Sequence, residues 1–143
     1  MSTPTNPSDS FPVQLEEEVQ FYDTDCGGVV HNLAYLRMVE KARATLFREV
    51  LQLAPAQMEA DQVFPAVTRT EVDYLKPAKL GDRIRIHARF EKIDRLRLNC
   101  VFELTLADDS GGKPLVRCRQ TSVLVEMPEG RPKRVPEKWR TTP

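Results

Sequence analysis

The sequence is short of the residues that build metal sites, disulfide frameworks and membrane spans. Its 143 residues include two histidines and three cysteines, and the cysteines are odd in number with no C-x-x-C spacing. This pattern argues against a structural zinc site and a disulfide framework. No apolar run approaches the ~20 residues that a membrane-spanning helix needs. The N-terminal MSTPTNPSDSFP has neither the basic start nor the apolar core of a signal peptide. These absences predict a cytoplasmic protein without a bound metal.

The charge of the chain has no dominant sign. Lys+Arg and Asp+Glu each number 21, so no basic field indicates a nucleic-acid partner. A hydrophobic content of 41% and a charged content of 29% are typical of globular proteins, and the length fits one domain.

Residues 1–12 are rich in Ser, Thr, Pro and Asn, which predicts a disordered tail. We expect the folded domain over residues 13–138 and a C-terminal tail over residues 139–143, with irregular structure after Met127.

One long helix is predicted near the start of the domain. The segment VQLEEEVQFY alternates loosely and favours a first strand. From Leu33 to Leu51 apolar residues recur at spacings of three and four, without Gly or Pro. Asn32, directly before them, is a favoured N-cap residue. The sequence therefore predicts a strand followed by an amphipathic helix.

The remainder reads as four strands joined by short turns. FPAVTRTEVDYLKP, RIRIHARFEKI, LRLNCVFELTL and PLVRCRQTSVLVEM carry the strand-like patterns. In the second of these segments His87 alternates with arginines, so we expect it on the surface or at an interface. The predicted class is α+β, with a five-stranded antiparallel sheet wrapped around one long central helix. Such a sheet leaves edges unpaired, which predicts pairing with a second copy of the chain.

The stretch YDTDCGGVVHNLAYL concentrates acid, glycine and imidazole just before the helix. A helix start has backbone N–H groups without partners and a partial positive charge. The N–H groups from Gly28 to Leu33 are therefore candidate donors to an oxyanion. A carboxylate such as Asp25 can attack a carbonyl carbon or take a proton from water. A simpler interpretation is that Asp23 and Asp25 only form Asx turns before a helix.

The stretch DTDCGGVVHNLAYLRMVEKAR resembles a signature of the hotdog-fold acyl-CoA thioesterases. The branch is that of 4-hydroxybenzoyl-CoA thioesterase and the Tol-Pal-associated thioesterases. The positions that match run from Thr24 to Tyr35 with fixed spacing, and they are Thr24, Asp25, Gly28, Val29, Val30 and Tyr35. VDYLKPAKLGDRIRI resembles a strand junction of the same family. Two positions depart from the family pattern. Asn32 stands where His or Phe is usual, with His31 one place earlier, and Glu18 stands where Gln or Arg is usual.

The resemblance implies a thioester hydrolase that cleaves an acyl-CoA to a free acid and CoA. It places the catalytic carboxylate at Asp25, as nucleophile or general base. Oxyanion and positioning roles fall to Gly28, Val30, His31, Asn32 and Tyr35. Weaker candidates for binding the phosphates of CoA are Arg95 and Arg97. No cofactor is implied, because CoA is part of the substrate. The expected partners are an acyl-CoA, or an acyl carrier protein thioester, and further copies of the chain in a dimer or tetramer.

Several alternatives stay open at the level of sequence. Glu40 lies on the predicted helix, where a related hotdog branch carries its catalytic acid, although a solvated or interface-paired glutamate is the simpler interpretation. Cys26 lies beside Asp25 and is an alternative nucleophile. The family signature, however, allows any residue at its position. The whole domain can also be a non-catalytic module that binds an acyl group or a protein. A dehydratase of the same fold relies on a histidine together with an acid on the helix, and the D-T-D loop argues against this alternative.

Overall fold

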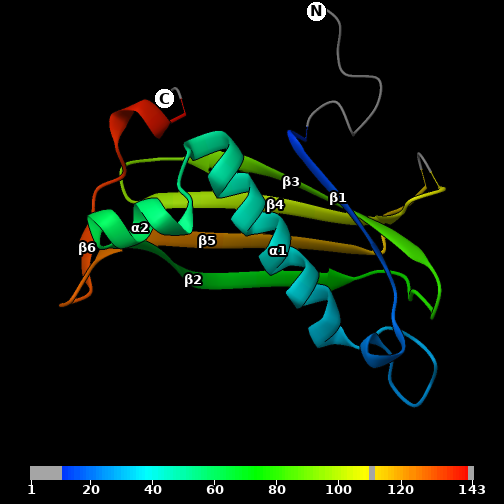
Figure 1. Ribbon diagram of the computed structural model, residues 1–143. Helices are drawn as coiled ribbons and strands as arrows, with labels where there is room; N and C mark the ends of the chain where they lie inside the picture. Colours follow the sequence, from blue (N-terminus) through cyan, green and yellow to red (C-terminus); the bar gives the residue numbers. More distant parts are fainter. Residues whose placement is uncertain (1–10, 110–111, 142–143) are drawn as a thin grey trace, which may run out of the picture.

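A long helix lies across one face of an antiparallel sheet. The computed structural model describes residues 11–109 and 112–141, and the helix is α1 (Asn32–Leu51). Five long strands form the sheet: β1 (Val13–Glu18), β2 (Val63–Tyr74), β3 (Arg83–Ile93), β4 (Arg97–Leu106) and β5 (Val116–Glu126). Their order is β1-β3-β4-β5-β2 (Figure 1). The predicted hotdog architecture is confirmed.

Short elements supplement this architecture. They are the 3-10 helices η2 (Phe21–Asp23) and η3 (Glu137–Trp139), the helix α2 (Pro55–Asp61) and the strand β6 (Arg131–Lys133). The prediction of irregular structure after Met127 is wrong at β6. Strand β4 pairs with β5 only as far as Val123, so the last three residues of β5 have a free edge on that side. Strand β6 pairs there, opposite residues 124–126.

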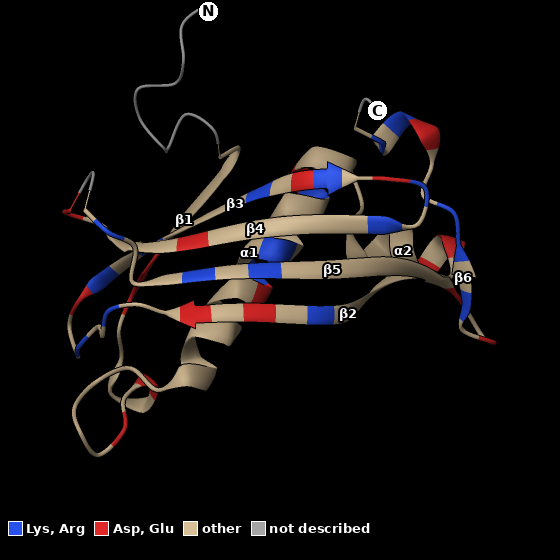
Figure 2. Cartoon of the chain, turned by 180° about the vertical axis from the view of Figure 1, so that it is seen from behind, with Lys and Arg blue, Asp and Glu red and all other residues tan. Residues whose placement is uncertain are grey.

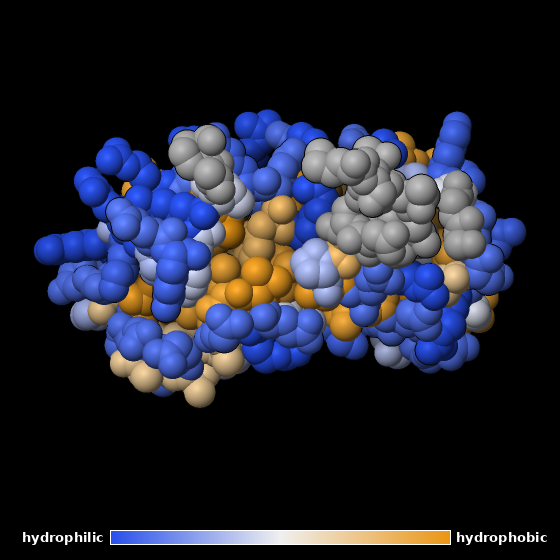
Figure 3. Space-filling model, turned by 90° about the horizontal axis from the view of Figure 1, so that it is seen from above, coloured by the Kyte–Doolittle hydropathy of each residue, from blue (hydrophilic) through white to orange (hydrophobic). Residues whose placement is uncertain are grey.

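The layer between α1 and the sheet is apolar. The helix buries most of the stripe that its spacing predicts, but Val50 is 40% exposed and the polar Thr45 is buried. Phe47 stacks on Phe90 with ring centroids 5.4 Å apart. The largest fully buried side chains of the core include Met38, Leu46, Phe47, Ile84, Ile86, Leu98, Phe102 and Leu104. Seen from above, apolar atoms show between hydrophilic rims (Figure 3). At about 25 cal/mol per Å² of apolar surface removed from water, burial in this layer is the main stabilising term.

The opposite face of the sheet is charged. Seen from behind, charged bands cover the strands, and the basic bands of β5 lie beside acidic bands of β2 (Figure 2). Arg117 lies 3.6 Å from Glu103, and Arg119 lies 3.4 Å from Glu91. These exposed pairs each contribute little to stability, about 0–1 kcal/mol. They keep this face hydrophilic without giving it one sign of charge.

His87 departs from its expected surface position. It lies on this charged face but is only 7% exposed. The ring of Phe11 covers it, with centroids 5.4 Å apart, and Arg89 lies over the Phe11 ring. Nε2 of His87 lies 3.1 Å from the Thr105 hydroxyl, and Nδ1 is buried without a partner among the described residues. The histidine is buried because Phe11, which the sequence assigned to the tail, packs on the sheet.

The two ends of the described chain pack on the domain. Val135 donates to the carbonyl oxygen of Arg95, and Trp139 is partly buried against the core. Thr141 hydrogen-bonds the backbone of Ile93. Of the tails predicted over residues 1–12 and 139–143, residues 1–10 and 142–143 lie outside the described residues, whereas Phe11, Trp139 and Thr141 contact the domain. No helix in the described part of the chain is long and apolar enough to cross a membrane.

Candidate active site

A tight hairpin loop precedes helix α1. Thr24 and Val30 form an antiparallel bridge, and the backbone N–H of Asp25 donates to the carbonyl oxygen of Val29 at 2.9 Å. The N–H of Gly28 returns to the carbonyl oxygen of Asp25 at 3.0 Å. Gly28 has φ +79°, a left-handed conformation that favours glycine. The glycine therefore allows the turn that places Asp25 at the exposed tip.

Asp25 presents its carboxylate to solvent. Its Oδ1 accepts a hydrogen bond of 2.8 Å from the N–H of Gly27. A Cβ at Gly27 would lie 3.2 Å from Oδ1, so the absence of a side chain there lets this contact form without crowding. Oδ2 has no hydrogen-bond partner within the described residues. The group is thus oriented by one backbone contact and keeps a free oxygen.

The helix begins one residue earlier than the sequence indicates. Asn32 is the first residue of α1 rather than its N-cap, so that prediction is wrong. His31 is the N-cap, and its Nδ1 accepts from the N–H of Ala34 at 3.2 Å. The cap requires an unprotonated Nδ1, so in the neutral ring the hydrogen is on Nε2. His31 can therefore cap the helix and still donate from Nε2.

Two backbone N–H groups at the helix start have no acceptor among the described residues. They belong to Asn32 and Leu33. By contrast, Val30 donates to the carbonyl oxygen of Ala78 and His31 donates to that of Asp23, both at 2.9 Å. The Gly28 N–H is already used within the loop. The Val29 N–H also has no acceptor among the described residues, but it lies in the loop. Of the predicted donors, Asn32 and Leu33 are the adjacent pair at the start of α1 that is available to an oxyanion.

Tyr35 and Tyr74 flank a shallow pocket beside the helix start. Its volume is about 260 Å³, and its lining comprises Val30, Asn32, Tyr35, Tyr74, Leu75, Lys76 and Pro77. The Tyr35 hydroxyl accepts from the N–H of Ala78 at 3.1 Å, and burial raises the Tyr35 pKa above its ordinary value. The Tyr74 hydroxyl donates to the carbonyl oxygen of Asn32 at 3.4 Å. The end of β2 is therefore part of the same site as the helix start.

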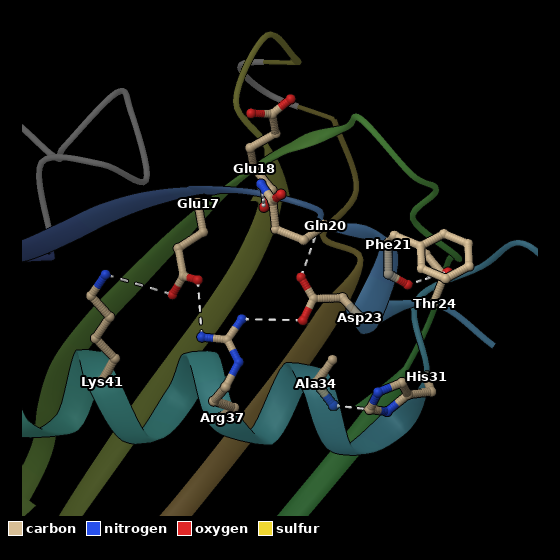
Figure 4. Close-up of polar contacts among 10 residues, drawn as sticks. All are labelled: Glu17, Glu18, Gln20, Phe21, Asp23, Thr24, His31, Ala34, Arg37 and Lys41. Atoms are coloured by element: carbon tan, nitrogen blue, oxygen red, sulfur yellow. Dashed lines mark hydrogen bonds and ion pairs between the residues drawn. The ribbon is translucent and has the colours of Figure 1, made fainter.

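A second aspartate supports the loop from below. Asp23 is 2% exposed, and its Oδ2 accepts from the N–H of Gln20 at 2.9 Å. Its Oδ1 accepts from Arg37 at 3.4 Å, and Arg37 also bonds Glu17 at 3.0 Å (Figure 4). Arg37 projects from α1, and Glu17 belongs to β1. No spacing signal pairs it with Glu17, because the two residues come from different elements.

The other candidates lie away from the Asp25 loop. Arg95 lies in the β3–β4 turn and Arg97 is the first residue of β4, at the opposite end of the sheet (Figure 1). Glu40 is half-exposed and bonds Arg43 at 2.6 Å, and Arg43 bonds Gln120 at 2.9 Å. One chain therefore does not bring these residues to Asp25.

The cysteines differ in exposure. Cys26 is exposed, whereas Cys100 and Cys118 are buried, and burial raises the pKa of both buried thiols to about 12. Neither buried thiol is a nucleophile at neutral pH. No cluster of three His, Cys, Asp or Glu side chains that could hold a metal occurs in the described part of the chain.

The fold and the sequence together identify the class of protein. A sequence model of the Thioesterase-like superfamily matches residues 19–141. The chain belongs to this superfamily.

Similar sequences carry related names. A 1,4-dihydroxy-2-naphthoyl-CoA hydrolase from Synechocystis is 28% identical over 127 residues, which is 88% of this chain and 90% of that protein. The acyl-CoA thioesterase YbgC from Haemophilus influenzae is 32% identical over 84 residues, which is 59% of each chain.

Solved structures share the fold. The 1,4-dihydroxy-2-naphthoyl-CoA thioesterase Slr0204 from Synechocystis has a TM-score of 0.76 at 23% identity, and the alignment covers 88% of this chain and 90% of that one. The protein SAV2348 from Staphylococcus aureus, solved in complex with CoA, has a TM-score of 0.80 at 17% identity, and the alignment covers 88% of this chain and 77% of that one.

Proposed function

We propose that the protein hydrolyses acyl-CoA thioesters to a free acid and CoA. The observation that carries this proposal is the exposed Asp25 carboxylate beside two free N–H groups at the start of α1. A thioesterase needs a group that attacks or activates water and a group that stabilises the developing oxyanion. The loop and the helix start supply these two groups within a few residues. The names of the similar sequences support the same reaction.

The residues have distinct roles in this proposal. Asp25 attacks the thioester carbon to give an anhydride that water then cleaves, or it takes a proton from the attacking water. In both routes the C–S bond breaks, CoA leaves as its thiolate and is then protonated, and the acyl group leaves as the acid. The N–H groups of Asn32 and Leu33 donate to the oxyanion of the tetrahedral intermediate. Each such donor contributes about 3–4 kcal/mol where single donors have been removed from enzymes.

His31 positions the reacting carbonyl group in the same proposal. Its Nδ1 caps the helix, so its Nε2–H is free to donate to the thioester oxygen. Gly28 and Val30 shape the loop through their backbone hydrogen bonds, and Tyr35 fixes the segment at Ala78. These three residues act on the site by holding its backbone.

A second copy of the chain is expected to complete the site. Strand β2 pairs only with β5 in the described sheet, so its other edge is free for a partner. Large apolar side chains are exposed at the loop and at the end of β2; they are Phe21, Tyr22, Leu33, Tyr74 and Leu75. Exposed apolar groups beside a free edge favour a dimer or a tetramer with the Asp25 loop at the subunit boundary.

Release of free thiol from a panel of thioesters tests the proposal. The panel comprises aromatic, short-chain and long-chain acyl-CoAs, and the same acyl groups on an acyl carrier protein. We expect enzyme-dependent release from at least one of these substrates. If no member is cleaved while acyl-CoA still binds, the protein is a non-catalytic binding module and the proposal is wrong.

A further inference from the structure

The two aspartates of the D-T-D segment have opposite environments. Asp25 is exposed, whereas Asp23 is 2% exposed and its carboxylate makes two polar contacts. Oδ2 accepts from the N–H of Gln20 at 2.9 Å, and Oδ1 faces the guanidinium of Arg37 at 3.4 Å. A buried carboxylate is costly unless it is paired and hydrogen-bonded. The sequence keeps this buried charge directly below the exposed loop.

The backbone of Asp23 closes the base of the same loop. Its carbonyl oxygen accepts from the N–H of His31 at 2.9 Å, and its N–H donates to the carbonyl oxygen of Gln20 at 2.9 Å. His31 in turn caps α1. Both ends of the loop that carries Asp25 therefore meet at one residue.

Arg37 connects this base to two rigid elements. It projects from α1, and its second contact is Glu17 of β1 at 3.0 Å. Figure 4 shows the continuous row from Lys41 through Glu17 and Arg37 to Asp23. The guanidinium thus fixes the Asp23 carboxylate relative to both the helix and the sheet. The same residue therefore joins this ion-paired side chain to the backbone bond that closes the loop.

We infer that Asp23, held by Arg37, is a positioning residue that sets the geometry of the Asp25 carboxylate relative to the start of α1. The inference rests on the proposed function, because it concerns the group that acts in that reaction. The matching positions of the family signature begin at Thr24 and give Asp23 no role.

Asp23→Asn is the primary test. The amide keeps the size of the side chain and can still accept from Gln20, but it loses the ion pair with Arg37. We expect kcat to fall by about 10²-fold, with KM within about threefold of wild type, because small misplacements of a reacting group have costs of this order. Rates are measured with one acyl-CoA, well below the unfolding temperature of each variant.

Asp94→Asn is the matched control. Asp94 also accepts from backbone N–H groups, those of Leu96 and Arg97 at 2.9 and 2.8 Å, but it lies in the β3–β4 turn. The same chemical change should leave kcat unchanged there. A loss of kcat in both variants would show a general structural effect and would overturn the positioning role.

Arg37→Gln and the double variant separate positioning from stability. Arg37 is half-exposed, so its replacement should fold. If Asp23 and Arg37 act as a unit, the second substitution should add no further loss. The kcat of the double variant should then be no lower than the lower of the two single-variant kcat values. Multiplying losses, or full activity in Asp23→Asn, would contradict the inference. Asp25→Asn, assayed in parallel, keeps the two proposals distinct: if it stays active the proposed mechanism fails, whatever Asp23→Asn does.

Discussion

The segment from Asp23 to His31 is shaped by hydrogen bonds, whereas the layer between α1 and the sheet is shaped by apolar packing. In the loop, backbone groups bond one another, a glycine has positive φ, and the Asp25 carboxylate faces solvent. In the layer, side chains such as Met38, Phe47 and Phe102 are almost completely buried. The first region exposes reactive groups at a small cost in packing, and the second supplies most of the free energy of folding.

This difference predicts that the two regions can be changed independently. A substitution in the apolar layer should lower the free energy of unfolding and leave the chemistry of folded molecules unchanged. A substitution in the loop should lower activity and leave the free energy of unfolding unchanged, unless it also strains the backbone.

Phe102→Ala should give the largest loss of stability. Phe102 is fully buried under α1, so truncation leaves a cavity and removes apolar contacts. We expect the free energy of unfolding to fall by about 3–5 kcal/mol, measured by urea denaturation. At temperatures where the variant is fully folded, kcat per folded molecule should stay near wild type. A specific loss of kcat there would mean that the core and the loop are not independent.

Gly28→Ala should have a smaller effect on stability and a clear effect on activity. Gly28 has φ +79°, and no atom within 4 Å would contact an added Cβ, so the cost is purely conformational. We expect a loss of about 1–2 kcal/mol. Gly130→Ala is the control, because Gly130 has φ +72° and equally open surroundings outside the loop. Both variants should lose similar stability, but only Gly28→Ala should lower kcat. Equal kcat values would contradict a role for the loop geometry.

His87→Gln should have the smallest effect, confined to the pH dependence of stability. Burial, followed by the charge of Arg85, lowers the His87 pKa in the folded protein, while Glu103 opposes this shift. As the pH falls, His87 therefore takes up its proton in the unfolded chain before it does so in the folded protein. The stabilisation is complete above the ordinary pKa of about 6.5 and is lost as the pH falls through the folded value. Wild type should thus lose more stability on acidification than His87→Gln. The opposite order in denaturation curves between pH 7 and pH 5 would contradict this assignment.

Much of the architecture follows from sequence patterns. The spacing of apolar residues identifies α1, and the alternation in RIRIHARFEKI and LRLNCVFELTL identifies β3 and β4. The exact cap of α1 does not follow, because His31 and Asn32 can each accept from a helix N–H. The choice depends on the bond between His31 and Asp23 across the loop. Periodicity cannot detect such a contact.

The ion-paired group below the loop is the clearest feature that the sequence does not reveal. Glu17, Asp23 and Arg37 come from β1, η2 and α1, and only the fold brings them together. The burial of His87 has a similar origin, since it depends on Phe11 packing over a strand face that otherwise reads as hydrophilic. Long-range side-chain contacts of this kind require the arrangement of the sheet.

The kcat/KM of Asp25→Asn, for one acyl-CoA that the wild type cleaves, shows whether the Asp25 carboxylate acts in the reaction. The amide keeps the size and hydrogen-bonding capacity of the side chain but lacks the anionic oxygen that attacks or takes a proton. We expect a fall of about 10²–10⁴-fold, with the unfolding temperature and the binding of CoA unchanged. Near-normal turnover in Asp25→Asn, together with loss of turnover in Glu40→Gln, would contradict the account and assign the reaction to the carboxylate on α1.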